Sequence, residues 1–224
     1  MNKYGIRLTI CVFLLLHSQT LAQSVPAVSA GLAIDTSTSM GAKWATVLAV
    51  AETILGVLQP QDQAFLLEFS QRPRLLQDYT DDFFLLRQGL KHLRAQGHTT
   101  LYDAVHEALL KLWAGRNPKK VLFVITDGND DHSTFSLQGS IELAKSYHIP
   151  IYAIGIGDPK AWSPLWNPLT LVSNQTDKRV ASEPLQRLTT ETGGAYFLLN
   201  LTDSNSKPAV LLQLRTLMAT KVRQ

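Results

Sequence analysis

Six segments of the chain have the apolar composition and the length of β-strands. Residues 121–125 (VLFVI) are apolar throughout, which is typical of a central strand covered on both faces. Residues 63–69 are followed by only four residues before a further short segment, a connection that suits an antiparallel hairpin. The predicted strands are residues 30–34, 63–69, 74–77, 121–125, 149–156 and 195–199.

Between these segments the apolar residues recur at helical spacing, every three or four positions. The clearest case is Trp44, Val47, Leu48, Ala51 and Leu55, a stretch that Pro60 brings to an end. The predicted helices cover residues 44–58, 83–93, 101–112, 137–144, 184–192 and 209–221. Alternating strands and helices predict an α/β fold: a doubly wound, Rossmann-like sandwich. We expect a mostly parallel six-stranded sheet with one short antiparallel edge strand and helices on both faces.

The N-terminus has the pattern of a secretory signal peptide over residues 1–22. Lys3 and Arg7 supply the positive charge, residues 8–16 are apolar, and cleavage is predicted after Ala22. The apolar run is far shorter than the roughly 20 residues that a membrane span needs. We therefore expect a secreted or periplasmic protein with no stable membrane span in the mature chain.

Cleavage changes the composition of the mature chain. Lys plus Arg falls from 21 to 19 while Asp plus Glu stays at 18, so the net charge falls from +3 to about +1. A charge so close to zero gives no support to nucleic-acid binding. The single cysteine, Cys11, is lost with the signal, and this absence of disulfides favours a bacterial exported protein.

The remainder is predicted to be a six-residue leader, residues 23–28, and one domain, residues 29–224. Residues 158–182 form a long polar and proline-rich insertion that contains Trp162 and Trp166. Long loops in compact domains are usually functional or mobile. The two tryptophans are therefore candidates for contact with a partner, although packing against the domain is the more ordinary role.

Oxygen-bearing side chains follow two of the predicted strands and precede one helix. Asp35, Ser37 and Ser39 come directly after the first strand, Asp127 follows the strand at 121–125, and Thr99 precedes the helix at 101–112. Ligands of open α/β sheets bind in the crevice at the carboxyl ends of the strands. Carboxylate and hydroxyl oxygens suit a hard cation such as Mg²⁺. The sequence therefore predicts a divalent-cation site at this edge.

These residues resemble those of the von Willebrand factor type A domain family. Its metal-ion-dependent adhesion site reads Asp-x-Ser-x-Ser, then Thr, then Asp, which Asp35, Ser37 and Ser39, then Thr99, then Asp127 match. The likeness spans about residues 28–220 and is strongest to bacterial exported members. It implies a non-catalytic binding module. Mg²⁺, with Mn²⁺ or Ca²⁺ as alternative ions, would be held by these five residues and would accept an Asp or Glu carboxylate from a partner protein.

Alternative roles for the same residues stay open. Asp and Ser favour helix N-termini, so the 35–39 stretch could be an ordinary capping loop. Asp103 is expected to cap or support its own helix beside the site. Asp130 is expected to be solvated, with tuning of the site as the alternative. His98, which replaces a glycine common in the family, is expected at the surface. The scattered histidines show no zinc-site spacing within one helix.

Two other functions compete with metal-dependent adhesion. A metal-dependent hydrolase or phosphoryl-transfer enzyme would need a general base, and His98 is the candidate. Against this function, the chain has neither a Gly-x-Ser-x-Gly elbow nor a phosphate-binding loop motif. A metal-independent scaffold would instead bind its partner through residues 158–182. The sequence does not indicate the oligomeric state.

Overall fold

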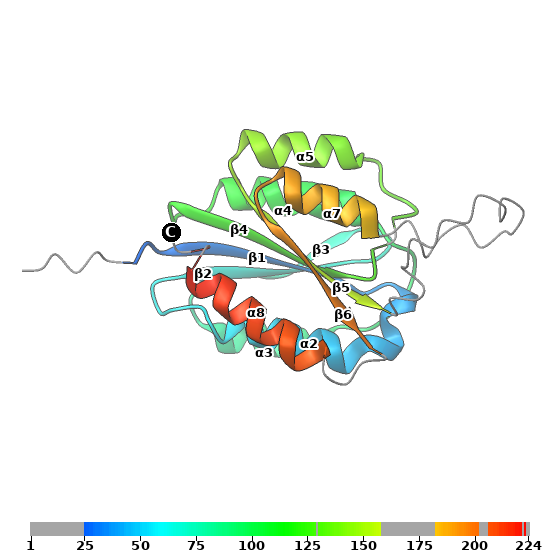
Figure 1. Ribbon diagram of the computed structural model, residues 1–224, viewed down its shortest axis with the longest axis horizontal. Helices are drawn as coiled ribbons and strands as arrows, with labels where there is room; N and C mark the ends of the chain where they lie inside the picture. Colours follow the sequence, from blue (N-terminus) through cyan, green and yellow to red (C-terminus); the bar gives the residue numbers. More distant parts are fainter. Residues whose placement is uncertain (1–24, 129, 158–181, 202–205, 221, 223–224) are drawn as a thin grey trace, which may run out of the picture.

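A six-stranded sheet forms the centre of the molecule in a computed structural model, which describes residues 25–128, 130–157, 182–201, 206–220 and 222 (Figure 1). The strands are β1 (Val28–Asp35), β2 (Gln63–Phe69), β3 (Pro73–Thr80), β4 (Lys119–Thr126), β5 (Ile151–Gly157) and β6 (Ala195–Asn200). Their order across the sheet is β3-β2-β1-β4-β5-β6. Every neighbouring pair is parallel except β2 and β3. The predicted fold class is confirmed.

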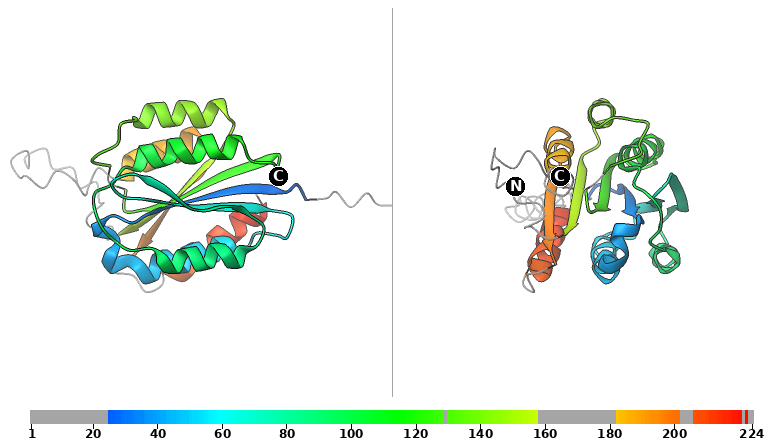
Figure 2. Two further views of the ribbon diagram at one scale, coloured as in Figure 1. Left: turned by 180° about the vertical axis from the view of Figure 1, so that it is seen from behind. Right: turned by 90° about the vertical axis from the view of Figure 1, so that its right-hand side faces the viewer.

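Helices cover both faces of this sheet. They are η1 (Thr38–Lys43), α2 (Trp44–Leu55), α3 (Phe83–His92), α4 (Leu101–Trp113), α5 (Leu137–Ser146), α7 (Ser182–Glu191) and α8 (Ser206–Thr220). One layer holds α2, α3 and α8, and the other holds α4, α5 and α7 (Figures 1 and 2). Among the described residues, no helix is long and apolar enough to span a membrane. The predicted signal peptide, Trp162 and Trp166 lie outside the described residues.

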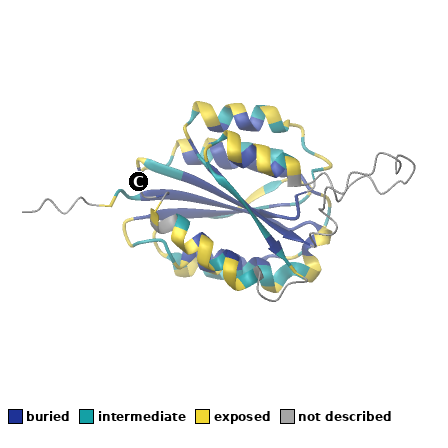
Figure 3. Ribbon diagram, in the orientation of Figure 1, coloured by how far each residue is buried: buried dark blue, intermediate teal, exposed yellow. Residues whose placement is uncertain are grey.

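Strands β1 and β4 are buried on both faces and divide the core into two parts. Ala30, Leu32 and Ile34 pack in the cluster that includes α2 and α3 residues, whereas Ala33 packs in the cluster of α4, α5 and α7. The same alternation continues in β4, and the strands in the middle of the sheet are coloured as buried in Figure 3. The unbroken apolar run at residues 121–125 is thus explained by two apolar neighbours, one on each side of the sheet.

The elements differ from the predicted ones chiefly at their ends. Strand β3 runs from Pro73 to Thr80, whereas the apolar pattern indicated only residues 74–77. Its pairing with β2 contains register shifts, and most of its side chains are at least partly exposed, so it lacks a clean alternation. After β1, the six residues of η1 form a 3₁₀ helix before α2 begins at Trp44. The helix predicted over residues 44–58 is therefore α2, and the 3₁₀ turn before it was not predicted.

The chain reverses its winding direction between β1 and β4. These strands are neighbours, with Ile34 beside Ile125. The connection from β1 leads through α2 to β2 on one side, whereas β4 leads through α5 to β5 on the other. The two helices lie on opposite faces of the sheet, and in open α/β sheets this is the point, at the carboxyl ends of the strands, where ligands bind. Asp35 and Asp127 lie at this point of the fold.

Candidate functional site

The chain turns after β1, and the side chain of Asp35 accepts a hydrogen bond from the backbone two residues later. Asp35, the last residue of β1, is fully buried, and its Oδ1 accepts a hydrogen bond of 2.8 Å from the Ser37 amide. The Ser37 and Ser39 hydroxyls are 3.1 Å apart. Alternate residues of this loop therefore place two hydroxyls side by side, one on a buried residue and one on an exposed residue.

The segment before α4 is bound to this loop. The Gln96 amide donates to the Thr36 carbonyl at 2.7 Å, and the Thr38 amide donates to the Gly97 carbonyl at 3.1 Å. Gly97 has a φ of +79°, a conformation that glycine adopts without the cost that a Cβ would bring. Thr99 follows and is only 4% exposed. The structure thus brings Thr99 into the same group of loops as Ser37 and Ser39.

Asp127, which follows β4, completes this group. Its Oδ2 accepts a hydrogen bond of 2.7 Å from Nζ of Lys43, on η1. Its Oδ1 is buried and has no hydrogen-bond partner among the described residues. The preceding residue, Thr126, donates through its hydroxyl to Oδ2 of Asp35 at 2.7 Å. The two acidic residues at the ends of β1 and β4 are therefore neighbours, linked through one threonine.

Burial and charge both act on the first of these acids. Loss of contact with water raises the pKa of Asp35 to about 6, and the nearby charge of Asp127 adds to the rise. Hydrogen bonds from Ser37 and Thr126 oppose the increase. The site thus concentrates negative charge where water cannot stabilise it, and Lys43 supplies one compensating positive charge at Asp127.

Two acidic residues near the site do not have the predicted roles. Asp130 was expected to be solvated, but its Oδ1 accepts hydrogen bonds from the amides of Leu101 at 2.7 Å and Tyr102 at 3.3 Å, at the start of α4. Burial raises its pKa, and these hydrogen bonds oppose that increase. Asp103 was expected to support its own helix. Its Oδ1 instead accepts from the amides of Thr134 and Phe135, which fixes the loop before α5.

Long-range contacts explain why these roles are not visible in the sequence. Asp130 lies 29 residues from Leu101, whose amide it accepts from, and Lys43 lies 84 residues from Asp127. No local pattern indicates either contact, because both depend on how the loops after β1 and β4 meet. His98 is exposed, as expected, at the rim of these loops.

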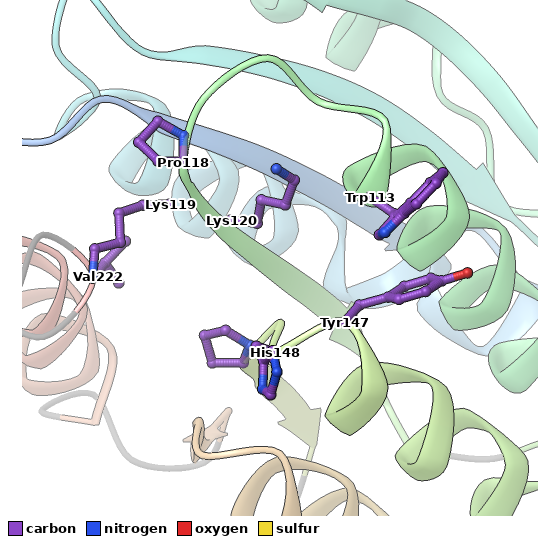
Figure 4. Close-up of a pocket in the computed structure, with 8 residues that line it drawn as sticks. Trp113, Pro118, Lys119, Lys120, Tyr147, His148 and Val222 are labelled. Carbon is purple, nitrogen blue, oxygen red and sulfur yellow. The ribbon is translucent and has the colours of Figure 1, made fainter.

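A hollow lies at the opposite end of the sheet from these loops. It has a volume of about 530 Å³, and its lining includes Trp113, Lys120, Tyr147 and His148 (Figure 4). Lys120 belongs to the start of β4, whereas Asp127 follows the end of that strand. This hollow is thus separate from the group of loops around Asp35, and it holds none of the residues that the sequence singled out.

Comparisons with known proteins agree with this architecture. The profile of the von Willebrand factor type A domain matches residues 31–214. BatB from Bacteroides thetaiotaomicron has a similar fold, with a TM-score of 0.64 and 18% identity over 87% of this chain and 100% of that one. A von Willebrand factor type A protein from Catenulispora acidiphila gives a TM-score of 0.65 and 15% identity over 87% and 42% of the respective chains.

A third similar structure is the von Willebrand factor domain of the type V pili tip protein Mfa5 from Porphyromonas gingivalis. Its TM-score is 0.63, with 12% identity over 89% of this chain and 97% of that chain. A search of curated proteins finds no match. The profile match covers most of the sequence, and the strand order and the loop arrangement are in keeping with it. The chain therefore belongs to the von Willebrand factor type A domain family.

Proposed function

We propose that this protein is an exported, non-catalytic binding module that captures a partner protein through a divalent cation, with Mg²⁺ as the physiological ion. The observation that carries the proposal is the buried Oδ1 of Asp127, which accepts no hydrogen bond from the described residues. A buried carboxylate oxygen with no hydrogen-bond partner among the described residues is costly, and a bound cation would remove that cost. The raised pKa of Asp35 supports the same conclusion, because a nearby cation would favour its ionised form.

The donor set suits a hard cation. The Ser37, Ser39 and Thr99 side chains offer hydroxyl oxygens, and Asp35 and Asp127 offer carboxylates, which are the ligand types that Mg²⁺ prefers. Mg²⁺ takes six ligands and usually keeps some water. Two carboxylates neutralise the charge of the ion, so a position held by water could be taken by an acidic side chain of a partner. The serines and Thr99 would position the ion without adding negative charge.

The structural neighbours make a partner protein the more reasonable ligand class. They include the pilus adhesin SpaC from Lactobacillus rhamnosus GG and the type V pili tip protein Mfa5. These likenesses, at 14% and 12% identity, carry the fold, and the binding role is inferred for this chain from its own loops. For the enzymatic alternative, the candidate base His98 stacks on His132 and faces Asp131. The His98 side chain therefore contacts two residues at the edge of the loops, His132 and Asp131.

Calorimetric titration with Mg²⁺ tests the metal part of this proposal. The parent protein should bind one ion, and Asp35→Ala should abolish the binding. Asp81→Ala is the matched control, because Asp81 is an exposed acid that pairs with Arg116 outside this group of loops. Absence of binding in the parent, or equal binding in the parent and Asp35→Ala, would remove the proposal.

Capture of a partner from the native envelope tests the second part. The parent should retain a partner in the presence of Mg²⁺ and release it on addition of a chelator. Retention that is unaffected by the chelator and by Asp35→Ala would instead favour metal-independent binding, for which residues 158–182 are the predicted surface.

A further inference from the structure

Three side chains that can bind metal converge at the rim of the loops, outside the five residues considered so far. His98 precedes Thr99, and Asp131 and His132 follow β4. One ring nitrogen of each histidine and one carboxylate oxygen of Asp131 all lie within 4.8 Å of one another. The two imidazole rings are stacked, with centroids 4.0 Å apart. We call these three residues the rim cluster.

The carboxylate of Asp131 lies against both imidazoles. Nδ1 of His132 is 3.0 Å from Oδ1, and Nδ1 of His98 is 3.7 Å from Oδ2. In a tetrahedral zinc site, metal–ligand distances near 2.0–2.1 Å place the ligand atoms about 3.3 Å apart. The two histidine–carboxylate spacings lie on either side of this value, and the three donor atoms lie within 4.8 Å of one another, so rotation of exposed side chains is what the binding of one ion requires.

The backbone holds the two loops of the rim cluster together. The amides of Asp131 and His132 donate to the Thr99 carbonyl at 3.1 and 3.2 Å, and the Thr99 amide donates to Oδ1 of Asp131 at 2.8 Å. The backbone at His98 is therefore held next to Asp131 and His132 before any ion binds. Such preorganisation lowers the conformational cost of forming a site.

From this geometry we infer that His98, Asp131 and His132 form a second metal site, selective for a borderline divalent transition-metal ion such as Zn²⁺. Two imidazoles and one carboxylate are ligands that zinc accepts, whereas Mg²⁺ and Ca²⁺ favour oxygen donors alone. Three protein ligands leave at least one coordination position for water or for a side chain of a bound molecule. An ion bound at Nδ1 of His132 would replace the proton on that nitrogen, which would be released to solvent, and the imidazole would keep its other proton on Nε2.

This second site does not depend on the magnesium proposal, since it shares no ligand with it. Its surface position also distinguishes it: the three side chains are 57%, 49% and 52% exposed for His98, Asp131 and His132, whereas Asp35 is fully buried. Removal of either histidine should thus leave the fold intact.

Zinc titration of the tag-free, chelator-dialysed protein in the presence of excess Mg²⁺ tests the inference, because Mg²⁺ then saturates the oxygen-rich site. The parent should bind one Zn²⁺ per chain. His98→Ala and His132→Ala should each weaken zinc binding by at least about tenfold. Mutation of residues that only hydrogen-bond to metal ligands already costs about that much affinity, and these two residues are ligands themselves. Asp131→Asn, which keeps an acceptor for the Thr99 amide, should weaken it as well. Co²⁺ in place of Zn²⁺ should give visible absorption bands that the same variants lose.

Two control variants separate this site from zinc binding at other surface histidines and from the magnesium site. His92→Ala removes an exposed histidine outside the rim cluster and should leave zinc binding unchanged. Asp35→Ala should abolish magnesium binding and keep the zinc site. The inference is overturned if the parent binds no Zn²⁺, or if its affinity is unaffected by both His98→Ala and His132→Ala. Failure of magnesium binding alone would count only against the proposed function.

Discussion

The ammonium of Lys43 neutralises Asp127 where a metal ion is proposed to bind, so removing this positive charge should strengthen Mg²⁺ binding. Its Nζ lies 2.7 Å from Oδ2 of Asp127, and the two side chains are only 17% and 6% exposed. If Mg²⁺ binds between Asp35 and Asp127, the ammonium competes with it for the same carboxylate. Lys43→Met keeps the aliphatic length of the side chain and removes the charge.

The pair lies between the surface and the interior, which sets the size of the expected effect. Exposed ion pairs contribute about 0–1 kcal/mol, whereas breaking a fully buried pair costs about 3–5 kcal/mol. For Lys43→Met without metal we expect a loss of about 1–3 kcal/mol, because Asp127 is left buried and without its ammonium partner. For a domain of this size that corresponds to a fall in melting temperature of roughly 2–4 °C per kcal/mol.

Metal binding should change in the opposite direction. The variant has no ammonium to displace, so a gain of about 1–2 kcal/mol would strengthen Mg²⁺ binding by a factor of about 5–30. Saturating Mg²⁺ should then restore much of the lost stability, since a ligand that binds only the folded state stabilises it by mass action. Calorimetry and thermal unfolding, each with and without Mg²⁺, measure these effects.

The matched control is Lys91→Met, because Lys91 is an exposed lysine on α3 whose ammonium donates a long hydrogen bond, of 3.5 Å, to the side chain of Gln88. It should change neither stability nor Mg²⁺ affinity. The reasoning is refuted if Lys43→Met is as stable as the parent without metal and binds Mg²⁺ no more tightly.

Four further outcomes are expected. The pKa of Asp35 in the folded protein, about 6, lies above its ordinary value of 3.8, so between these pH values the folded state binds the proton more tightly than the unfolded state. The metal-free protein should therefore lose up to about 3 kcal/mol of stability as the pH rises from about 4 through 6. Denaturant unfolding at several pH values measures this loss, and a stability that does not change with pH would count against it. Mg²⁺ affinity should fall below pH 6, where protons compete for the same carboxylate. Asp130→Ala should lower stability by about 1–2 kcal/mol, through loss of its hydrogen bond to the Leu101 amide, and an unchanged melting temperature would contradict that role. Gly194→Ala should lower the free energy of unfolding by more than about 3 kcal/mol or prevent folding, since an added Cβ would lie 1.8 Å from the Ile151 carbonyl oxygen. A variant as stable as the parent would show that the backbone can move apart at this contact.

The sheet could be predicted from the sequence because its strands are buried in a simple pattern. The apolar run at residues 121–125 is what a strand with helices on both faces requires, and it is β4. The ends of β3 could not be predicted, because this edge strand is partly exposed and irregular in register. The 3₁₀ helix that carries Lys43 also escaped prediction, since it has one buried residue, Met40, and therefore no apolar periodicity to indicate it.

The five predicted site positions followed from local chemistry, whereas their surroundings did not. Hydroxyl and carboxylate residues at the ends of two strands and before one helix are visible in the sequence. Which groups face them is set by contacts across the chain, such as Lys43 with Asp127 and His98 with His132. These contacts exist only once the loops after β1 and β4 are assembled, so neither the internal cation nor the rim cluster could be predicted from spacing.

Anomalous diffraction from crystals grown with Mn²⁺, which favours the same oxygen ligands as Mg²⁺, tests the central claim most directly. The account predicts one strong peak within about 2.2 Å of the Ser37 and Ser39 hydroxyl oxygens, a distance typical of such ligands, with the Lys43 ammonium moved away from Asp127. A data set with no peak between Asp35 and Asp127, and with Lys43 still paired to Asp127 at saturating Mn²⁺, would contradict it.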